Sequence, residues 1–154
     1  MKSLNQWFEE YAVSHQNRTN KKIHYICVPA IFFSIVGLLM SIPNDFLLNN
    51  LKLNQPIIEN WAVVILVLVM IFYIRLSVVM AVKIAIFALF CLILNYYIGQ
   101  YVSLSMFSIA MFGVAWIGQF YGHKIEGKKP SFLKDLQFLM IGPAWVVQNL
   151  FSKK

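Results

Sequence analysis

Long runs of apolar residues with almost no charge constrain what this chain can fold into. Of its 154 residues, 60% are hydrophobic and only 12% are charged. Soluble domains carry about 25% charged residues, whereas uninterrupted runs of about 20 apolar residues are typical of membrane-spanning helices. The sequence therefore predicts an all-α integral membrane protein rather than a soluble domain.

The apolar runs predict a bundle of four transmembrane helices within a single membrane domain that covers residues 1–154. Their approximate limits are residues 23–42, 60–74, 78–98 and 101–121. The second run is short, because a hydrocarbon core of about 30 Å needs about 20 residues. Arg75 and Lys83 follow it, and their long side chains could reach the interface and rescue the short span. Residues 44–59 are expected to form a solvated loop.

The amino-terminal residues 4–14 show the spacing of an amphipathic helix. Apolar side chains recur there at i, i+3, i+4 and i+7, which places them on one helical face. Ser3 with Gln6 three residues later predicts a capping box at the helix start. Two positions remain open for this helix: on the bilayer surface, or packed against the rest of the protein.

The last apolar segment, residues 136–151, contains Gly142 and Pro143 near its middle. A break at these two residues and the short length of the segment favour a re-entrant or interfacial hairpin over a fifth span. Such a segment would end on the side of the membrane where it begins.

The distribution of basic residues predicts the orientation of the spans. Lysine and arginine concentrate in the amino-terminal segment, near Arg75 and in residues 122–135, and four spans place all three regions on one side. Only Lys52 lies on the other side. Because cytoplasmic loops are rich in lysine and arginine, both termini are predicted to be cytoplasmic, in a bacterial inner membrane or the endoplasmic reticulum. Topology and anionic lipids also explain the net charge of +7 better than a nucleic-acid partner.

The chain contains only three histidines, and each lies in a polar stretch beside the end of an apolar run. They are His15, His24 and His123. The predicted topology puts all three on the cytoplasmic face, where they could share a metal ion, since neutral imidazole is the commonest metal ligand in proteins. Glu126 lies one helical turn after His123 and could be directed at the same ion. Histidine with carboxylate favours non-haem iron(II) with open positions for oxygen.

Other interpretations of these polar residues remain open. Histidine is amphipathic, so the three could simply lie at the interface of a non-catalytic transporter or scaffold. A histidine-rich hydroxylase or desaturase normally requires more than three histidines. Lys21, Lys22 and Lys128 could attract a carboxylate group, although a topology signal explains them equally well. No phosphate-binding loop, Ser-His-Asp order or CxxC pair occurs, so nucleotide binding and serine or thiol hydrolysis have no support.

Two stretches of the sequence resemble the small membrane-bound 2-hydroxy fatty acid dioxygenases of fatty-acid α-oxidation. The first stretch spans residues 11–29 and carries Tyr11, His15, Asn17, Asn20, His24 and Pro29. The second spans residues 119–143 and carries Gln119, Gly122, His123, Glu126, Gly127, Pro130, Gly142 and Pro143. With the pattern of spans, the similarity covers nearly the whole chain, and no departure from the family pattern occurs at these positions.

The resemblance implies an Fe(2+)-dependent enzyme that uses dioxygen to remove the carboxyl carbon of a 2-hydroxy fatty acid. It implies His15, His24 and His123 as iron ligands, and Glu126 as a catalytic residue that binds the iron or orients its ligands. A substrate with a polar head and an apolar tail suits a site at a membrane surface, with membrane lipids around it. Lys21, Lys22 or Lys128 would then contact the substrate carboxylate.

Overall fold

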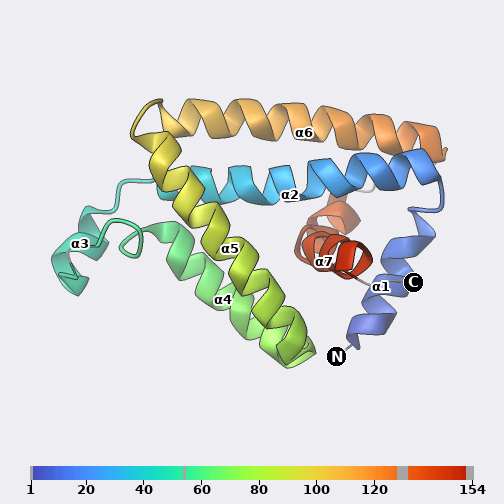
Figure 1. Ribbon diagram of the computed structural model, residues 1–154, viewed down its shortest axis with the longest axis horizontal. Coiled ribbons are helices and arrows are strands. Elements are labelled where there is room, and N and C mark those ends of the chain that lie inside the picture. Colours follow the sequence, from blue (N-terminus) through green and yellow to red (C-terminus); the bar gives the residue numbers. More distant parts are fainter. Residues whose placement is uncertain (1, 54, 128–131, 152–154) are drawn as a thin grey trace. The chain divides into compact units, whose positions relative to one another are not determined.

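All regular structure in the described part of the chain is helical. The computed structural model describes residues 2–53, 55–127 and 132–151. Seven helices and no strand occur in these ranges (Figure 1). The helices are α1 (Leu4–Val13), α2 (Arg18–Met40), α3 (Asp45–Leu51), α4 (Trp61–Leu76), α5 (Val78–Gly99), α6 (Leu104–Glu126) and α7 (Phe132–Phe151). The all-α prediction is confirmed at this level.

The start of α1 follows the local sequence signal. The Ser3 side chain accepts a hydrogen bond from the Gln6 backbone amide, while the Gln6 side chain accepts one from the Ser3 amide. This is the predicted capping box, and it satisfies two amides that the first helical turn leaves without partners.

The start of α2 lies five residues before the predicted first span, at Arg18 instead of residue 23. The Asn17 side-chain oxygen accepts hydrogen bonds from the Thr19 and Asn20 amides, so a polar cap begins the helix before its apolar part. Pro29 lies within the helix. His24 is therefore held on a regular helix rather than at its frayed end.

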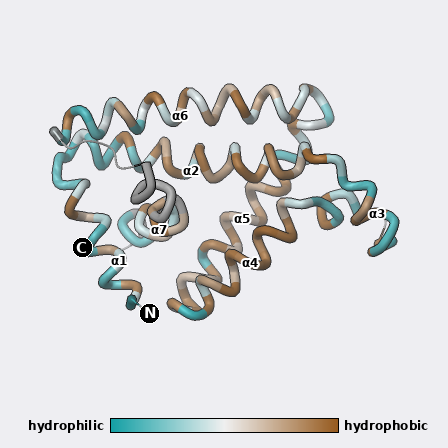
Figure 2. Tube along the Cα trace, turned by 180° about the vertical axis from the view of Figure 1, so that it is seen from behind, coloured by the Kyte–Doolittle hydropathy of each residue, from teal (hydrophilic) through white to brown (hydrophobic). Residues whose placement is uncertain are grey.

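Three helices of the described residues, α2, α5 and α6, are long and apolar enough to cross a membrane, which indicates membrane association. The other predicted span corresponds to α4, which is apolar but has only 16 residues. Figure 2 shows the hydrophobic colouring along α4 and α5 and the hydrophilic start of α2. Four spans therefore remain a prediction, as do the single membrane domain and the cytoplasmic termini.

Two predictions about irregular segments are wrong. The expected loop of residues 44–59 contains α3, in which Asp45 occupies the first turn and Leu47 is buried. An acidic residue near the amino terminus stabilises a helix through the helix dipole, and burial of one apolar side chain stabilises it further.

The expected break at Gly142 and Pro143 is absent, because α7 continues through both residues. Residues 141–146 are all buried, so packing of this stretch outweighs the backbone hydrogen bond that proline loses. A re-entrant or interfacial position of α7 stays a prediction.

The chain divides into two compact units, residues 1–32 with 112–154 and residues 33–111. In the first unit, α1 packs against α7, and the beginning of α2 lies close to the end of α6. A β-carbon added at Gly118 of α6 would lie 2.6 Å from the Cys27 sulfur of α2. Small residues permit this kind of close approach between apolar helices.

The second unit contains α3, α4, α5 and the adjoining parts of α2 and α6. Here α4 packs against α5, and Tyr73, Ile84 and Cys91 are fully buried. The buried Asn95 side chain donates hydrogen bonds to the Cys91 and Phe33 carbonyls. The bond to Phe33 joins α5 to α2, as polar side chains commonly do between apolar helices.

Candidate metal centre

All three histidines of the chain meet in the first unit. His15 lies in the turn between α1 and α2, His24 lies on α2, and His123 lies on the last turns of α6. One ligand nitrogen of each falls within 4.8 Å of the other two. Their ring centroids are separated by 4.3 Å for His15 and His24, 5.0 Å for His24 and His123, and 5.6 Å for His15 and His123. The structure therefore brings the three residues together as the sequence predicted.

Backbone carbonyl groups fix the tautomers of two of these rings. His15 Nδ1 lies 2.6 Å from the Tyr11 carbonyl oxygen, and His24 Nδ1 lies 3.0 Å from that of Asn20. A carbonyl oxygen only accepts, so each Nδ1 must carry the proton and each Nε2 presents a lone pair. Both Nε2 atoms are buried and have no hydrogen-bond partner among the described residues. This is the usual arrangement of metal-binding histidines, whose second nitrogen donates to a carbonyl or carboxylate.

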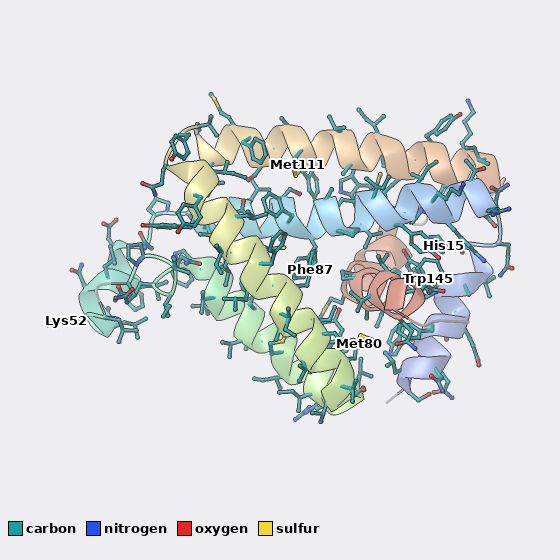
Figure 3. The ribbon with its side chains drawn as sticks, in the orientation of Figure 1. His15, Lys52, Met80, Phe87, Met111 and Trp145 are labelled. Carbon is teal, nitrogen blue, oxygen red and sulfur yellow. The ribbon has the colours of Figure 1, made fainter. Side chains whose placement is uncertain are left out.

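Aromatic rings hold the His15 imidazole in place. The Tyr11 ring stacks on it at a centroid distance of 4.0 Å and an interplanar angle of 6°. The Trp145 ring of α7 lies 5.6 Å from the His15 ring and 5.0 Å from the Tyr11 ring, and Figure 3 shows His15 and Trp145 close together. Burial in these surroundings lowers the pKa of His15 from 6.5 to about 4, because a charged imidazolium loses its hydration there. The ring is therefore neutral at physiological pH, as a metal ligand must be.

Glu126 connects the end of α6 to the start of α2. Its carboxylate accepts hydrogen bonds from the backbone amides of Gln16, at 2.7 Å, and Asn17, at 3.0 and 3.1 Å. It also accepts one from the Asn20 side chain, at 2.9 Å. The same Asn20 provides the carbonyl that fixes His24. Among the described residues, the group that could hold a metal ion contains the three histidines and does not contain Glu126.

A small cavity lies beside the histidine nitrogens. Its volume is about 30 Å³, which is enough for an ion with a water-sized group, since one water needs about 10 to 15 Å³ on this measure. The residues that line it are Tyr11, His15, His24, Val28, Ile31, Trp116, Gln119, His123 and Phe138. Polar ligand atoms thus meet a largely apolar wall.

The predicted substrate-binding lysines do not line this cavity. Lys21 is half-buried and Lys22 is exposed, both near the start of α2. Lys128 lies outside the described residues. Their assignment to the substrate carboxylate stays a prediction.

Sequence reasoning did not identify Trp116 and Trp145 as residues of the site. Trp116 precedes His123 by seven positions, two helical turns, and this spacing could have placed both on one face of α6. Trp145 gave no comparable signal, because its proximity to His15 results from the docking of α7 on α1.

Three imidazoles in a buried cluster could bind a metal ion and leave coordination positions open for other ligands. Histidine nitrogens without partners inside a protein are costly, and a bound cation would satisfy them. The residues present therefore fit a metal site, although they do not by themselves select one transition metal.

Comparison with known proteins identifies the family of the chain. No curated protein and no solved structure matches it. The model of the family described as 2-hydroxy-palmitic acid dioxygenase Mpo1-like matches residues 1–154, the entire chain. This match confirms the resemblance noted in the two histidine-containing stretches, and the protein belongs to the 2-hydroxy-palmitic acid dioxygenase Mpo1-like family.

Proposed function

We propose that this protein is an iron(II)-dependent dioxygenase that removes the carboxyl carbon of 2-hydroxy fatty acids and leaves acids one carbon shorter. The observation that carries the proposal is the pair of buried, unpartnered Nε2 atoms of His15 and His24 beside His123. The family description adds the substrate class. A membrane-associated chain with a metal-ligating cluster suits a substrate that is itself a membrane lipid derivative.

In this proposal the three histidines hold iron(II), which imidazole ligands suit and which would supply the capacity to react with dioxygen. Burial keeps His15 neutral, and the Tyr11 and Asn20 carbonyls orient the His15 and His24 rings. The cavity wall of Val28, Ile31 and Phe138 excludes water from the reacting end of the substrate. The site lies on α2 and α6, two helices long and apolar enough to cross a membrane, which supports a substrate whose acyl chain remains in an apolar environment.

Glu126 acts as a positioning residue in this proposal. Its carboxylate accepts hydrogen bonds from the turn that carries His15 and from Asn20, whose carbonyl orients His24. Partners of this kind determine ligand orientation and metal affinity. The predicted catalytic contribution of Glu126 is thus assigned to holding two ligands rather than to contact with the substrate.

Metal analysis followed by product analysis tests the proposal. The full chain is purified in detergent, its iron content is measured, and 2-hydroxypalmitate is supplied with and without oxygen. We expect about one iron per chain and an oxygen-dependent C15 acid detected by mass spectrometry. The variants His24→Ala and His123→Ala should lose both iron and turnover, because each removes one of only three imidazole ligands.

A matched control is Lys124→Ala, since Lys124 is the exposed neighbour of His123 on α6. This variant should retain iron and activity. Stoichiometric iron in a variant that lacks all three histidines would refute the site. Product formation without any dependence on iron would refute the role of iron but support the proposed substrate class. An iron-free, inactive protein would instead favour a transporter or scaffold.

A further inference from the structure

The residues that line the cavity beside the histidines carry two opposite kinds of buried, unpartnered polar group. His15 Nε2 and His24 Nε2 are acceptors, and their complement is a cation or a donor. Trp116 also lines the cavity, and its indole N–H is buried without a hydrogen-bond partner among the residues that the structure describes. Indole nitrogen only donates, so its complement is an acceptor, such as an oxygen atom. A cation together with an oxygen ligand would satisfy both sets.

The orientation of Trp116 is restrained by its own helix. Phe112 and Phe120, one turn before and one turn after it on α6, contact its ring at centroid distances of 6.0 and 5.3 Å. Gln119 lines the same cavity from the same helix, and the spacing of Trp116, Gln119 and His123 places all three on one face. This face of α6 therefore offers one histidine of the cluster, the unpartnered indole donor of Trp116, and the Gln119 amide, whose side chain also interacts with His24.

The cavity lining within the described chain contains no lysine or arginine. A positive side chain among the imidazoles would repel a bound metal cation, because like charges interact strongly in a poorly hydrated site. Neutral donors avoid this conflict. An indole N–H and an amide can hold a carboxylate oxygen beside the histidines without weakening the metal site.

We propose, on the basis of the dioxygenase function above, that Trp116 is a carboxylate-binding residue of this enzyme. Its indole N–H donates a hydrogen bond to a carboxylate oxygen of the 2-hydroxy acid, and Gln119 provides a second donor. Recognition of the acid head group then depends on α6 rather than on the lysines at the start of α2. Selectivity for a carboxylate over an uncharged head group follows, because hydrogen bonds to charged acceptors are stronger.

The variant Trp116→Phe tests this assignment, because it keeps an aromatic ring and removes the donor. Equilibrium binding of labelled 2-hydroxypalmitate to the metal-loaded protein, without oxygen, should weaken roughly ten- to hundredfold. In turnover assays KM should rise by a similar factor, with a smaller change in kcat and an unchanged metal content. Inhibition by 1,2-hexadecanediol, which retains the hydroxyl group but lacks the carboxylate, should change little.

Trp7→Phe is the matched control, because the Trp7 indole nitrogen is also buried without a partner but does not line the cavity. This control should bind 2-hydroxypalmitate like the unmodified protein. Gln119→Leu provides a second test if Trp116→Phe fails to fold, and it should weaken binding of the acid more than that of the diol.

Unchanged binding of the acid in folded Trp116→Phe would overturn the assignment. Equal weakening for acid and diol would also overturn it, because that result indicates a packing role. If Lys21→Ala or Lys22→Ala greatly weakened binding of 2-hydroxypalmitate and Trp116→Phe did not, the lysines rather than Trp116 would be the carboxylate-binding residues. If the unmodified protein binds the acid but never converts it, the dioxygenase proposal fails while the binding assay still decides the role of Trp116.

Discussion

Gly122 of α6 leaves room for a buried hydrogen-bonding side chain of α2. A β-carbon at this position would lie 2.3 Å from the Asn20 side-chain oxygen and 3.4 Å from His24 Cε1. No side chain fits there unless Asn20 moves, and Asn20 both binds Glu126 and provides the carbonyl that orients His24. The smallest substitution at this glycine should therefore disturb the proposed metal ligands.

We expect Gly122→Ala to lower the free energy of unfolding by about 1 to 3 kcal/mol through overpacking and to reduce metal content. Thermal unfolding and metal analysis measure the two effects. Gly113→Ala is the control, because Gly113 lies on the same helix and an added β-carbon meets nothing within 4 Å. Alanine there should stabilise the helix by about 0.5 to 1 kcal/mol. Equal behaviour of the two variants would contradict the proposed contact.

The buried position of His15 makes the metal-free protein sensitive to acid. Burial lowers the pKa of His15 from 6.5 to about 4, so the unfolded chain binds this proton more readily than the folded one. The stability associated with neutral His15 is present above pH 6.5 and is lost as the pH falls from 6.5 toward 4. Its magnitude is on the order of 3 kcal/mol, since one pKa unit corresponds to about 1.4 kcal/mol.

Denaturation of the metal-free protein at several pH values between 4 and 7.5 measures this effect. His15→Gln removes the titrating group, so its stability should depend less steeply on pH in this window. An identical pH dependence in both proteins would show that His15 is not held in its neutral form.

At the scale of elements, Glu126 explains how the end of α6 is joined to the start of α2. A carboxylate is unfavourable at the carboxyl end of its own helix but favourable at the amino end of another. Glu126 accepts from the Gln16 and Asn17 amides, immediately before α2 begins at Arg18. The two helix ends are thereby fixed at the position where both contribute histidines.

Glu126→Gln tests this connection, because glutamine offers one acceptor oxygen and turns an NH₂ group toward the donors. We expect a loss of about 1 kcal/mol for a partly exposed network and roughly tenfold weaker metal binding, measured by thermal unfolding and metal titration. Glu9→Gln on the exposed side of α1 should change neither. Unchanged metal affinity in Glu126→Gln would exclude the positioning role.

Local sequence signals predicted that most of the helices exist, but they predicted less well where each helix begins and ends. The capping box of α1 and the apolar runs of α2, α5 and α6 depend on neighbouring residues and could be identified directly. The continuity of α7 through Pro143 could not, because burial of Trp145 and its neighbours, rather than local propensity, maintains that helix. The extension of α6 to Glu126 likewise depends on partners that lie 106 to 110 residues away.

At the scale of the whole molecule, the number of spans is the main property to test. α4 has 16 residues, fewer than the roughly 20 that a hydrocarbon core requires. Exposed apolar side chains such as Val67, Leu68 and Ile71 nevertheless suit a lipid environment. We expect α4 to span with help from Arg75 at its end, which places Ser77 and Lys52 on opposite sides of the membrane.

Single cysteines at these two positions, in a chain with Cys27 and Cys91 replaced by alanine, measure the topology by labelling with a membrane-impermeant maleimide. Ser77→Cys should react only from the cytoplasmic side and Lys52→Cys only from the other. Reaction of both from one side would show that α4 does not cross. Retention of activity in the cysteine-free background is the control for correct insertion.

The sequence by itself determined the class of protein and the set of candidate ligands. Long apolar runs indicate membrane association, and three histidines in polar stretches are the candidate ligands for a metal. Tertiary structure decided which atoms are free to bind, because helix packing buries the Nε2 atoms of His15 and His24 without a partner, while their Nδ1 atoms donate to carbonyls four residues earlier in the chain. It also placed Glu126 on backbone amides and Trp116 beside the histidines. Glu126 and its amide partners are about 110 positions apart in the sequence. No local pattern encodes a contact that depends on how helices pack.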